Sequence, residues 1–173
     1  MKTTLALVCI ALLLIAAPAS AAPVRWSGNG HYYESVGESL PWWDASAAAV
    51  SRGGYLATLT SAAENDWVRD NVLEGYSLLG GIQPPGSPEP DGGWEWVTGE
   101  AWAFTNWAAG EPNNWGDENV LAIYPGSGQW NDHPGSNFYP FLVEYERPVP
   151  LPGALVLLGS GLVGLMGLKR KKG

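Results

Sequence analysis

Two short segments, Glu111-Pro112-Asn113-Asn114-Trp115-Gly116-Asp117-Glu118 and Trp130-Asn131-Asp132, decide how the rest of the sequence is interpreted. Both read as loop-like runs that are rich in side-chain oxygen atoms. The oxygen donors are Glu111, Asn113, Glu118, Asn131 and Asp132. Carboxylates mixed with amide carbonyls, with no need for Cys or His, are the ligands of a hard cation, and Ca²⁺ takes about six to eight oxygens in flexible geometry whereas Mg²⁺ keeps more of its waters. The two segments therefore predict a metal-binding site.

Ordinary turn chemistry is the alternative for these segments. Pro-Asn-Asn and Asn-Asp are common turn sequences, in which the acidic side chains are simply solvated. Either segment alone favours that interpretation, whereas both together in a Trp-rich sequence favour the metal site. Pro112 adds a structural expectation: an X-Pro bond can be cis at modest cost, and a cis bond would turn Glu111 and Asn113 to the same side.

The order Glu-Pro-Asn, then a Glu shortly downstream, then Trp-Asn-Asp resembles the calcium site of the C-type lectin-like domain. The resemblance implies that one Ca²⁺ is held by Glu111, Asn113, Glu118, Asn131 and Asp132. It also implies that vicinal sugar hydroxyls coordinate the ion, and that a Glu-Pro-Asn site takes mannose-, glucose- or fucose-type glycans. The implied sugar-binding side chains are Glu111, Asn113, Glu118 and Asn131, with Trp115 stacking on the sugar. Packing of Trp115 on its own loop is the alternative.

The remaining patterns predict an α+β domain. Helices are expected from Pro41 to Val50 and from Ser61 to Leu73, the second with a capping box formed by Ser61 and Glu64. Strands are expected at residues 28–35, 55–59, 78–81, 94–99, 120–124 and 141–145. This order resembles the C-type lectin-like fold, with two helices flanking small antiparallel sheets and long calcium-binding loops. Trp96, Trp107 and Trp130 are assigned to the core, whereas His31 has no expected partner.

The sequence departs from the resembled family in two ways. Vertebrate-type members carry two disulfides, and the equivalent positions here are Ala49, Val120, Gly135 and Val143. The replacements at 49, 120 and 143 are small or apolar, which predicts packed pairs in place of covalent links. An auxiliary calcium of the family would map to Asp91, Asn114 and Asn119, where two amides replace carboxylates. We therefore expect a single ion.

Charge excludes one class of partner. Residues 22–148 contain four Arg against all 17 Asp and Glu residues, which leaves a net charge of −13. Such a domain repels nucleic acid and anionic membranes and favours cations.

An enzyme is not expected, because no nucleophile–base spacing or phosphate-binding loop is present and a metal would occupy Glu111, Glu118 and Asp132. A calcium-stabilised structural or adhesion protein that binds protein partners is the alternative to a lectin.

The two ends of the sequence read as targeting segments that flank a domain at residues 22–148. Residues 1–21 are typical of a secretory signal peptide and include Cys9, the only cysteine. Residues 149–173 combine a Pro-Leu-Pro motif, an apolar helix at about 151–168 and a basic end, which resembles a PEP-CTERM sorting signal. That resemblance implies an inner-membrane intermediate, cleavage by an exosortase-type enzyme, and delivery to a bacterial outer surface or exopolysaccharide matrix. A plain single-pass anchor is the alternative.

Overall fold

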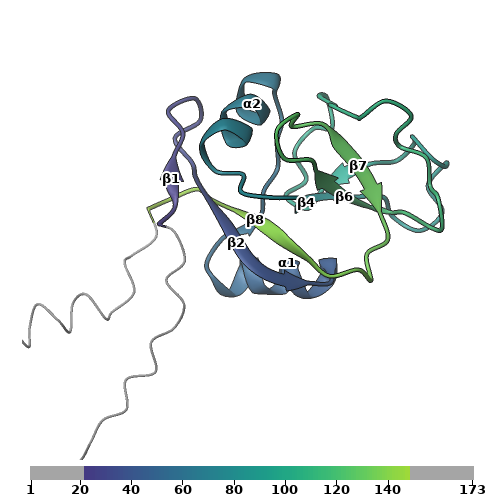
Figure 1. Cartoon of the computed structure of the whole chain (residues 1–173), viewed down its shortest axis with the longest axis horizontal. Helices are drawn as coiled ribbons and strands as arrows, with labels where there is room; N and C mark the ends of the chain where they lie inside the picture. The colour runs from purple at the N-terminus through teal and green to yellow at the C-terminus, as the bar shows by residue number, and fades with distance from the viewer. Residues whose placement is uncertain (1–21, 149–173) are drawn as a thin grey trace, which may run out of the picture.

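The computed structural model describes residues 22–148, which form eight strands and two helices. In chain order these are β1 (Val24–Arg25), β2 (Tyr32–Leu40), α1 (Trp42–Ser51), β3 (Tyr55–Leu56), α2 (Ala62–Asn71), β4 (Ser77–Ile82), β5 (Glu95–Trp96), β6 (Val120–Ile123), β7 (Trp130–His133) and β8 (Tyr139–Tyr145). The predicted α+β class is confirmed (Figure 1). None of the helices within residues 22–148 is long and apolar enough to cross a membrane. The signal peptide, the sorting motif and the helix predicted at 151–168 lie outside the described residues.

Helix α1 begins and ends where the sequence predicts. Pro41 is the extended N-cap residue, and its carbonyl accepts a 2.9 Å hydrogen bond from the Ala45 N–H. Pro is well suited to a helix start because it lacks an N–H that would otherwise be left without a partner. The helix ends at Ser51, and two residues later Gly53 has a φ of 87°, a left-handed conformation that suits glycine after a helix.

Helix α2 has only half of the expected capping box. The Ser61 side chain accepts a hydrogen bond from the Glu64 N–H at 3.3 Å. The Glu64 carboxylate does not return to Ser61 but accepts from the Thr60 N–H at 2.7 Å and the Tyr33 hydroxyl at 2.5 Å. Because Tyr33 belongs to β2, the buried carboxylate of Glu64 links the start of α2 to that strand.

The strands form one connected sheet in place of separate small sheets. The order is β1-β2-β8-β4-β6-β7, with β3 added to β8 and β5 to β4. All pairings are antiparallel except that of β4 with β8. Because β1 and β8 both pair with β2, the two ends of the described chain lie side by side (Figure 1).

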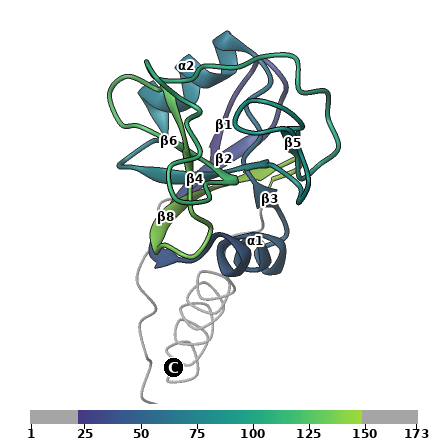
Figure 2. The same ribbon diagram turned by 90° about the vertical axis from the view of Figure 1, so that its right-hand side faces the viewer.

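Two apolar cores lie on the two faces of this sheet, with α1 and α2 on opposite sides of it (Figures 1 and 2). Side chains alternate along β8, where Leu142 joins the core that contains α2, whereas Phe141 and Val143 join the core that contains α1. Trp96 and Trp130 are buried in the first core and Trp107 packs against it, so the three tryptophans lie where the sequence predicts.

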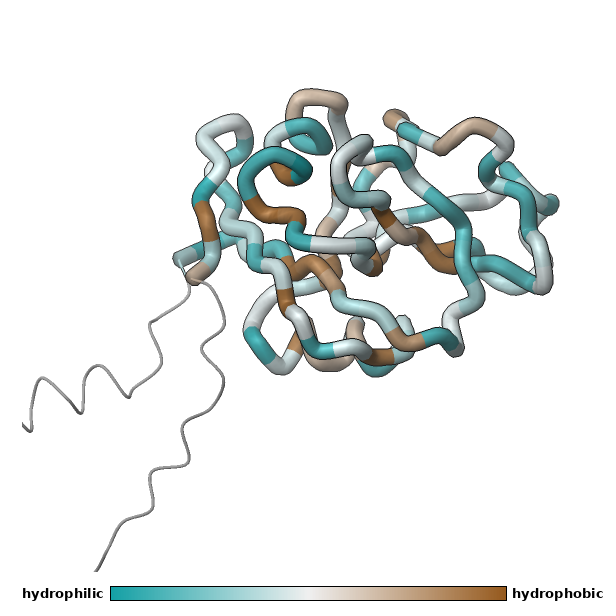
Figure 3. Tube along the Cα trace, in the orientation of Figure 1, coloured by the Kyte–Doolittle hydropathy of each residue, from teal (hydrophilic) through white to brown (hydrophobic). Residues whose placement is uncertain are grey.

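The long connections gather on one side of the molecule. The segments at 83–94 and 97–119 leave β4 and β5 and carry mostly hydrophilic residues at the right of Figure 3. Two strands were not predicted, β1 and β7. Residues Trp130–His133 form β7 and not a loop-like run, because Trp130 is fully buried and all four residues pair with β6. Several other predicted strands have wrong bounds. The first long strand, expected at 28–35, is Tyr32–Leu40, the strand expected at 55–59 ends at Leu56, and the strand expected at 94–99 is Glu95–Trp96.

Candidate functional site

Strand β7 and the loop at 111–118 meet through the side chain of Asp132. Both oxygen atoms of its carboxylate accept the Asn113 N–H, at 3.1 and 2.9 Å, and one also accepts the Asn114 N–H at 2.7 Å. Asp132 is fully buried and Asn131 nearly so. Hydrogen bonds from backbone N–H groups to a carboxylate are short and strong. Asp132 therefore fixes the loop against the sheet.

The loop closes on itself around Trp115. Its N–H donates to Asn113 Oδ1 at 2.8 Å and to Glu118 Oε2 at 2.9 Å. The Glu118 N–H in turn donates to Asn114 Oδ1 at 2.8 Å. Asn114 and Asp117 have left-handed φ values of 51° and 71°, which Asn and Asp tolerate better than most residues. The loop is thus held by its own amide and carboxylate side chains.

Glu111 and Asn113 lie on the same side of the loop, as predicted. The Glu111–Pro112 bond is cis, and the Asn113 side-chain amide donates to the Glu111 carboxylate. The Trp115 side chain, by contrast, does not pack on the loop and is 84% exposed. The alternative that Trp115 covers its own loop is therefore wrong.

The carboxylates of Glu111, Glu118 and Asp132 lie near one another at this site. Burial raises the pKa of Glu111, and the neighbouring carboxylates of Asp132 and Glu118 raise it further. Burial also raises the pKa of Glu118, followed by the effect of Asp132, while the Trp115 N–H and His133 oppose the shift. None of the ion pairs within residues 22–148 involves any of the three.

Four of the five predicted ligands line one hollow of about 460 Å³. Its lining consists of Tyr76, Glu111, Asn113, Trp115, Glu118, Tyr124, Asn131, His133 and Tyr139. The fifth, Asp132, lies behind them and holds the loop. The structure thus brings all the predicted site residues together. The three tyrosines were not identified as site residues from the sequence. Tyr76 precedes β4 and Tyr139 begins β8 without a motif, and Tyr124 is the last residue of the strand expected at 120–124, with nothing that marks it as part of a site.

The donor set fits a hard cation by its chemistry, since it offers carboxylate and amide oxygens and unneutralised charge. Within residues 22–148, however, no group of three or more His, Cys, Asp or Glu side chains is arranged as a metal centre. The Asp132 carboxylate oxygens accept hydrogen bonds from loop N–H groups, and the Asn113 side-chain amide donates a hydrogen bond to the Glu111 carboxylate. These contacts keep the donors close together through protein hydrogen bonds.

The positions equivalent to the family's cysteines lie among apolar side chains. A Cβ atom built on Gly135 would lie 3.3 Å from Val120 Cγ1. Ala49 and Val143 are fully buried members of the core that contains α1. Apolar packing thus occupies these places.

A second polar cluster, not predicted from the sequence, lies beneath α2. We call it the buried network; it consists of Asn29, His31, Tyr33, Thr58, Thr60, Glu64 and Glu144. His31 Nδ1 lies 2.7 Å from Glu144 Oε1, so His31 has a partner after all. Burial raises the pKa of Glu144, whereas His31 and the Thr58 N–H lower it. No sequence motif signals this cluster, because its members lie far apart in the chain.

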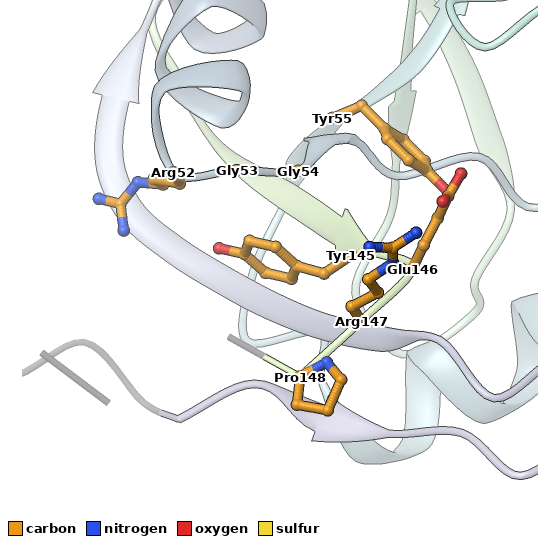
Figure 4. A pocket seen from close by; sticks show the side chains of 8 residues that line it. All are labelled: Arg52, Gly53, Gly54, Tyr55, Tyr145, Glu146, Arg147 and Pro148. Atoms are coloured by element: carbon orange, nitrogen blue, oxygen red, sulfur yellow. The ribbon is translucent and has the colours of Figure 1, made fainter. Parts of the chain in front are cut away.

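Another hollow, of about 380 Å³, lies where β8 ends (Figure 4). It is lined by Arg52, Gly53, Gly54, Tyr55, Tyr145, Glu146, Arg147 and Pro148. The Arg52 guanidinium lies 3.4 Å from the Glu34 carboxylate, which also accepts the Tyr145 hydroxyl. This hollow contains none of the predicted site residues, and two of its polar side chains are already paired.

Comparison with known proteins identifies the family. The Lectin C-type domain model matches residues 38–144, and the chain belongs to this family, whose members are typically binding proteins and not enzymes. Lectin BRA-3 of Megabalanus rosa is 32% identical over 108 residues, which cover 60% of this chain and 64% of BRA-3. Halomucin of Haloquadratum walsbyi is 35% identical over 140 residues, which cover 68% of this chain but 1% of halomucin. The match therefore spans less than two thirds of either relative.

The fold is shared with solved structures. A calcium-independent type II antifreeze protein superposes with a TM-score of 0.62 at 21% identity, over 76% of this chain and 96% of that protein. At this identity the likeness shows the fold alone. The predicted C-type lectin-like fold is confirmed.

Proposed function

We propose that this protein is a calcium-dependent lectin that binds mannose-, glucose- or fucose-type glycans. The observation that carries the proposal is the hollow lined by Glu111, Asn113, Glu118 and Asn131, where the two carboxylates have raised pKa values and form no ion pair with any group in residues 22–148. Family membership and the similarity to a lectin of another organism support a carbohydrate ligand.

The residues divide the work between positioning and binding. Asp132 holds the loop through the Asn113 and Asn114 N–H groups, so the donors reach the site already arranged. Ca²⁺ would be held by Glu111, Asn113, Glu118, Asn131 and Asp132 and would accept two sugar hydroxyls as ligands. The same hydroxyls would donate hydrogen bonds to the Glu carboxylates and accept them from the Asn side-chain amides. Trp115, 84% exposed at the rim, offers an aromatic face for the sugar ring.

The test is a glycan array probed with the purified full chain, first in calcium and then in EDTA. Binding to mannose- or fucose-type glycans that disappears in EDTA is the expected result. Equal binding in EDTA would remove calcium from the proposal, and no binding in calcium would remove the sugar.

A protein-binding role is the second candidate, and one contact favours it. The Asp132 carboxylate accepts the Asn113 and Asn114 N–H groups, so these hydrogen bonds hold the loop without a cation, and a calcium-independent antifreeze protein shares the fold. In this case calcium would only stabilise the domain, or be absent, and the exposed Trp115 would contact a protein surface. A chain that binds no glycan yet is retained by cells through Trp115 would support this role.

We propose further that the chain is exported and sorted. Residues 1–21 would direct secretion, and residues 149–173 would hold the chain in the inner membrane until an exosortase-type enzyme cleaves near Pro150, releasing it to the surface or matrix. Mass measurement of the protein recovered outside the cells is the test. A mature chain ending close to Pro150 is expected, whereas retention of residues 151–168 in the membrane fraction would indicate a plain anchor.

A further inference from the structure

One side of the hollow is made of aromatic rings. We call it the aromatic wall, formed by Tyr76, Tyr124, His133 and Tyr139. Ring centroids of Tyr76 lie 5.1 Å from Tyr124 and 4.9 Å from Tyr139, and those of His133 and Tyr139 lie 4.8 Å apart. These distances are within the range of favourable tilted and edge-to-face pairs. The wall is therefore a packed unit and not a set of independent side chains.

The inner rings of the wall are anchored, and the outer one is not. Tyr76 and Tyr139 pack against the core that contains α1. Tyr124 belongs to neither core and is 38% exposed. Tyr124 directly follows β6, and its ring packs against the ring of Tyr76. The exposed ring of Tyr124 is therefore held in place by a partly buried one. A rigid aromatic surface of this kind binds at little cost in conformational entropy.

The wall begins where the calcium donors end. The Tyr124 hydroxyl donates to Asn131 Oδ1 at 3.4 Å, and Asn131 Nδ2 donates to the Tyr76 hydroxyl at 3.1 Å. A ligand that reaches Asn131 from the Glu111 side has Tyr124 as its next neighbour. Trp115 lines the same hollow from the loop.

The charge of the domain bears on the kind of ligand. Residues 22–148 carry a net charge of −13, and one bound Ca²⁺ would still leave the domain strongly negative. An acidic sugar placed on this ring would be repelled by that charge, whereas a neutral sugar would not.

We propose that the site takes a neutral oligosaccharide of at least two sugar units, with one unit at the calcium donors and the next on the Tyr124 ring. This inference rests on the proposed lectin function. It adds a second subsite, assigns its surface to the aromatic wall, and excludes uronic-acid polymers as the preferred ligand.

The experiment compares ligands by calorimetry in calcium with the purified full chain. Methyl mannoside, mannobioses of each linkage and a mannuronic acid disaccharide are titrated. The readout is the ratio of disaccharide to monosaccharide affinity, because any loss of calcium binding lowers both affinities and cancels. The variants are Tyr124→Ala, which removes the ring, and Tyr124→Phe, which keeps it. Phe138→Ala is the matched control, since Phe138 is 66% exposed but does not line the hollow.

For the wild type we expect a mannobiose of one linkage to bind with about tenfold higher affinity than methyl mannoside. This ratio corresponds to the free energy of one good aromatic contact. Tyr124→Ala should reduce this ratio to near one, whereas Tyr124→Phe and Phe138→Ala should keep it. A wild-type ratio near one for every linkage, an unchanged ratio in Tyr124→Ala, or stronger binding of the acidic disaccharide would overturn the proposal while leaving the lectin function standing. Absence of any calcium-dependent sugar binding would instead remove the lectin function itself, and the second subsite with it.

Discussion

The buried network and the calcium donors both bring carboxylates together, but they differ in what surrounds each carboxylate. In the buried network Glu144 faces His31 at 2.7 Å and the Thr58 N–H at 2.9 Å, and Glu64 accepts from the Tyr33 hydroxyl. At the donor site Glu111 accepts from the Asn113 side-chain amide and Glu118 from the Trp115 N–H, but no ion pair within residues 22–148 reaches either carboxylate, and the carboxylate of Asp132 lies close to both. A carboxylate satisfied from within the chain supports the fold, whereas one left facing like charge is available to a ligand.

The largest expected effect comes from neutralising the donors. Glu118→Gln removes a charge from the site while keeping the shape of the side chain, so calcium-dependent sugar binding should fall by at least about a hundredfold, as for loss of a strong charge-assisted interaction. Calorimetry with methyl mannoside measures this. Asp117→Asn is the matched control, because Asp117 lies in the same loop, is exposed, and has a φ of 71° that Asn tolerates. If both variants bind as the wild type does, Glu118 is not a ligand.

The second prediction concerns the buried network, where a substitution should lower stability and leave calcium binding unchanged. Glu144→Ala should lower the free energy of unfolding by about 3 kcal/mol, because it leaves His31 and the Thr58 N–H without their buried partner. Urea denaturation is the measurement. Glu146→Ala, at an exposed position two residues later, should change stability little. Calcium affinity of the folded Glu144→Ala chain should stay close to that of the wild type, and a large loss there would mean that the two clusters are coupled.

These two clusters also mark how far the sequence could be interpreted. Glu111 to Glu118 is a contiguous run, so its donors could be recognised before any fold was known. Asn131 and Asp132 could be recognised as partners but not as part of a strand, because a four-residue strand with two polar members has no clear alternation. His31 and Glu144 are 113 residues apart, and only the pairing of β2 with β8 brings them together.

The aromatic wall was beyond sequence reasoning for the same reason. Tyr76, Tyr124 and Tyr139 come from three different strand ends, and nothing in their neighbours distinguishes a site tyrosine from a core one. The helix predictions succeeded where local chemistry decides the outcome, at Pro41 and Ser61. The return half of the capping box failed because tertiary contacts with Tyr33 drew Glu64 away.

A smaller effect should come from adding calcium to the folded chain. A ligand that binds only the native state adds about 2.7 kcal/mol at roughly 100 times its Kd. We expect calcium to raise the free energy of unfolding of the wild type by this order. The gain should vanish in Glu118→Gln and persist in Glu146→Ala, which differ in whether the lost carboxylate lies in the donor site. An equal gain in both variants would place the calcium elsewhere.

The smallest effect should be a dependence on pH that changes sign with calcium. Because the pKa values of Glu111 and Glu118 are raised in the folded state, these groups stabilise the calcium-free fold below their unfolded pKa, near the ordinary value of 4.5, and lose that contribution as pH rises through the folded values. With calcium bound, the charged forms are favoured, so these groups should stabilise the fold at neutral pH and lose that contribution on acidification. The measurement is urea denaturation between the ordinary carboxyl pKa and neutrality, with and without calcium. The pKa of Glu144 is also raised, so its contribution to the pH dependence has the same direction. Subtracting the stability curve of a Glu111→Gln, Glu118→Gln double variant from that of the wild type cancels this contribution. If the difference curve has the same slope against pH with and without calcium, calcium does not contact Glu111 or Glu118.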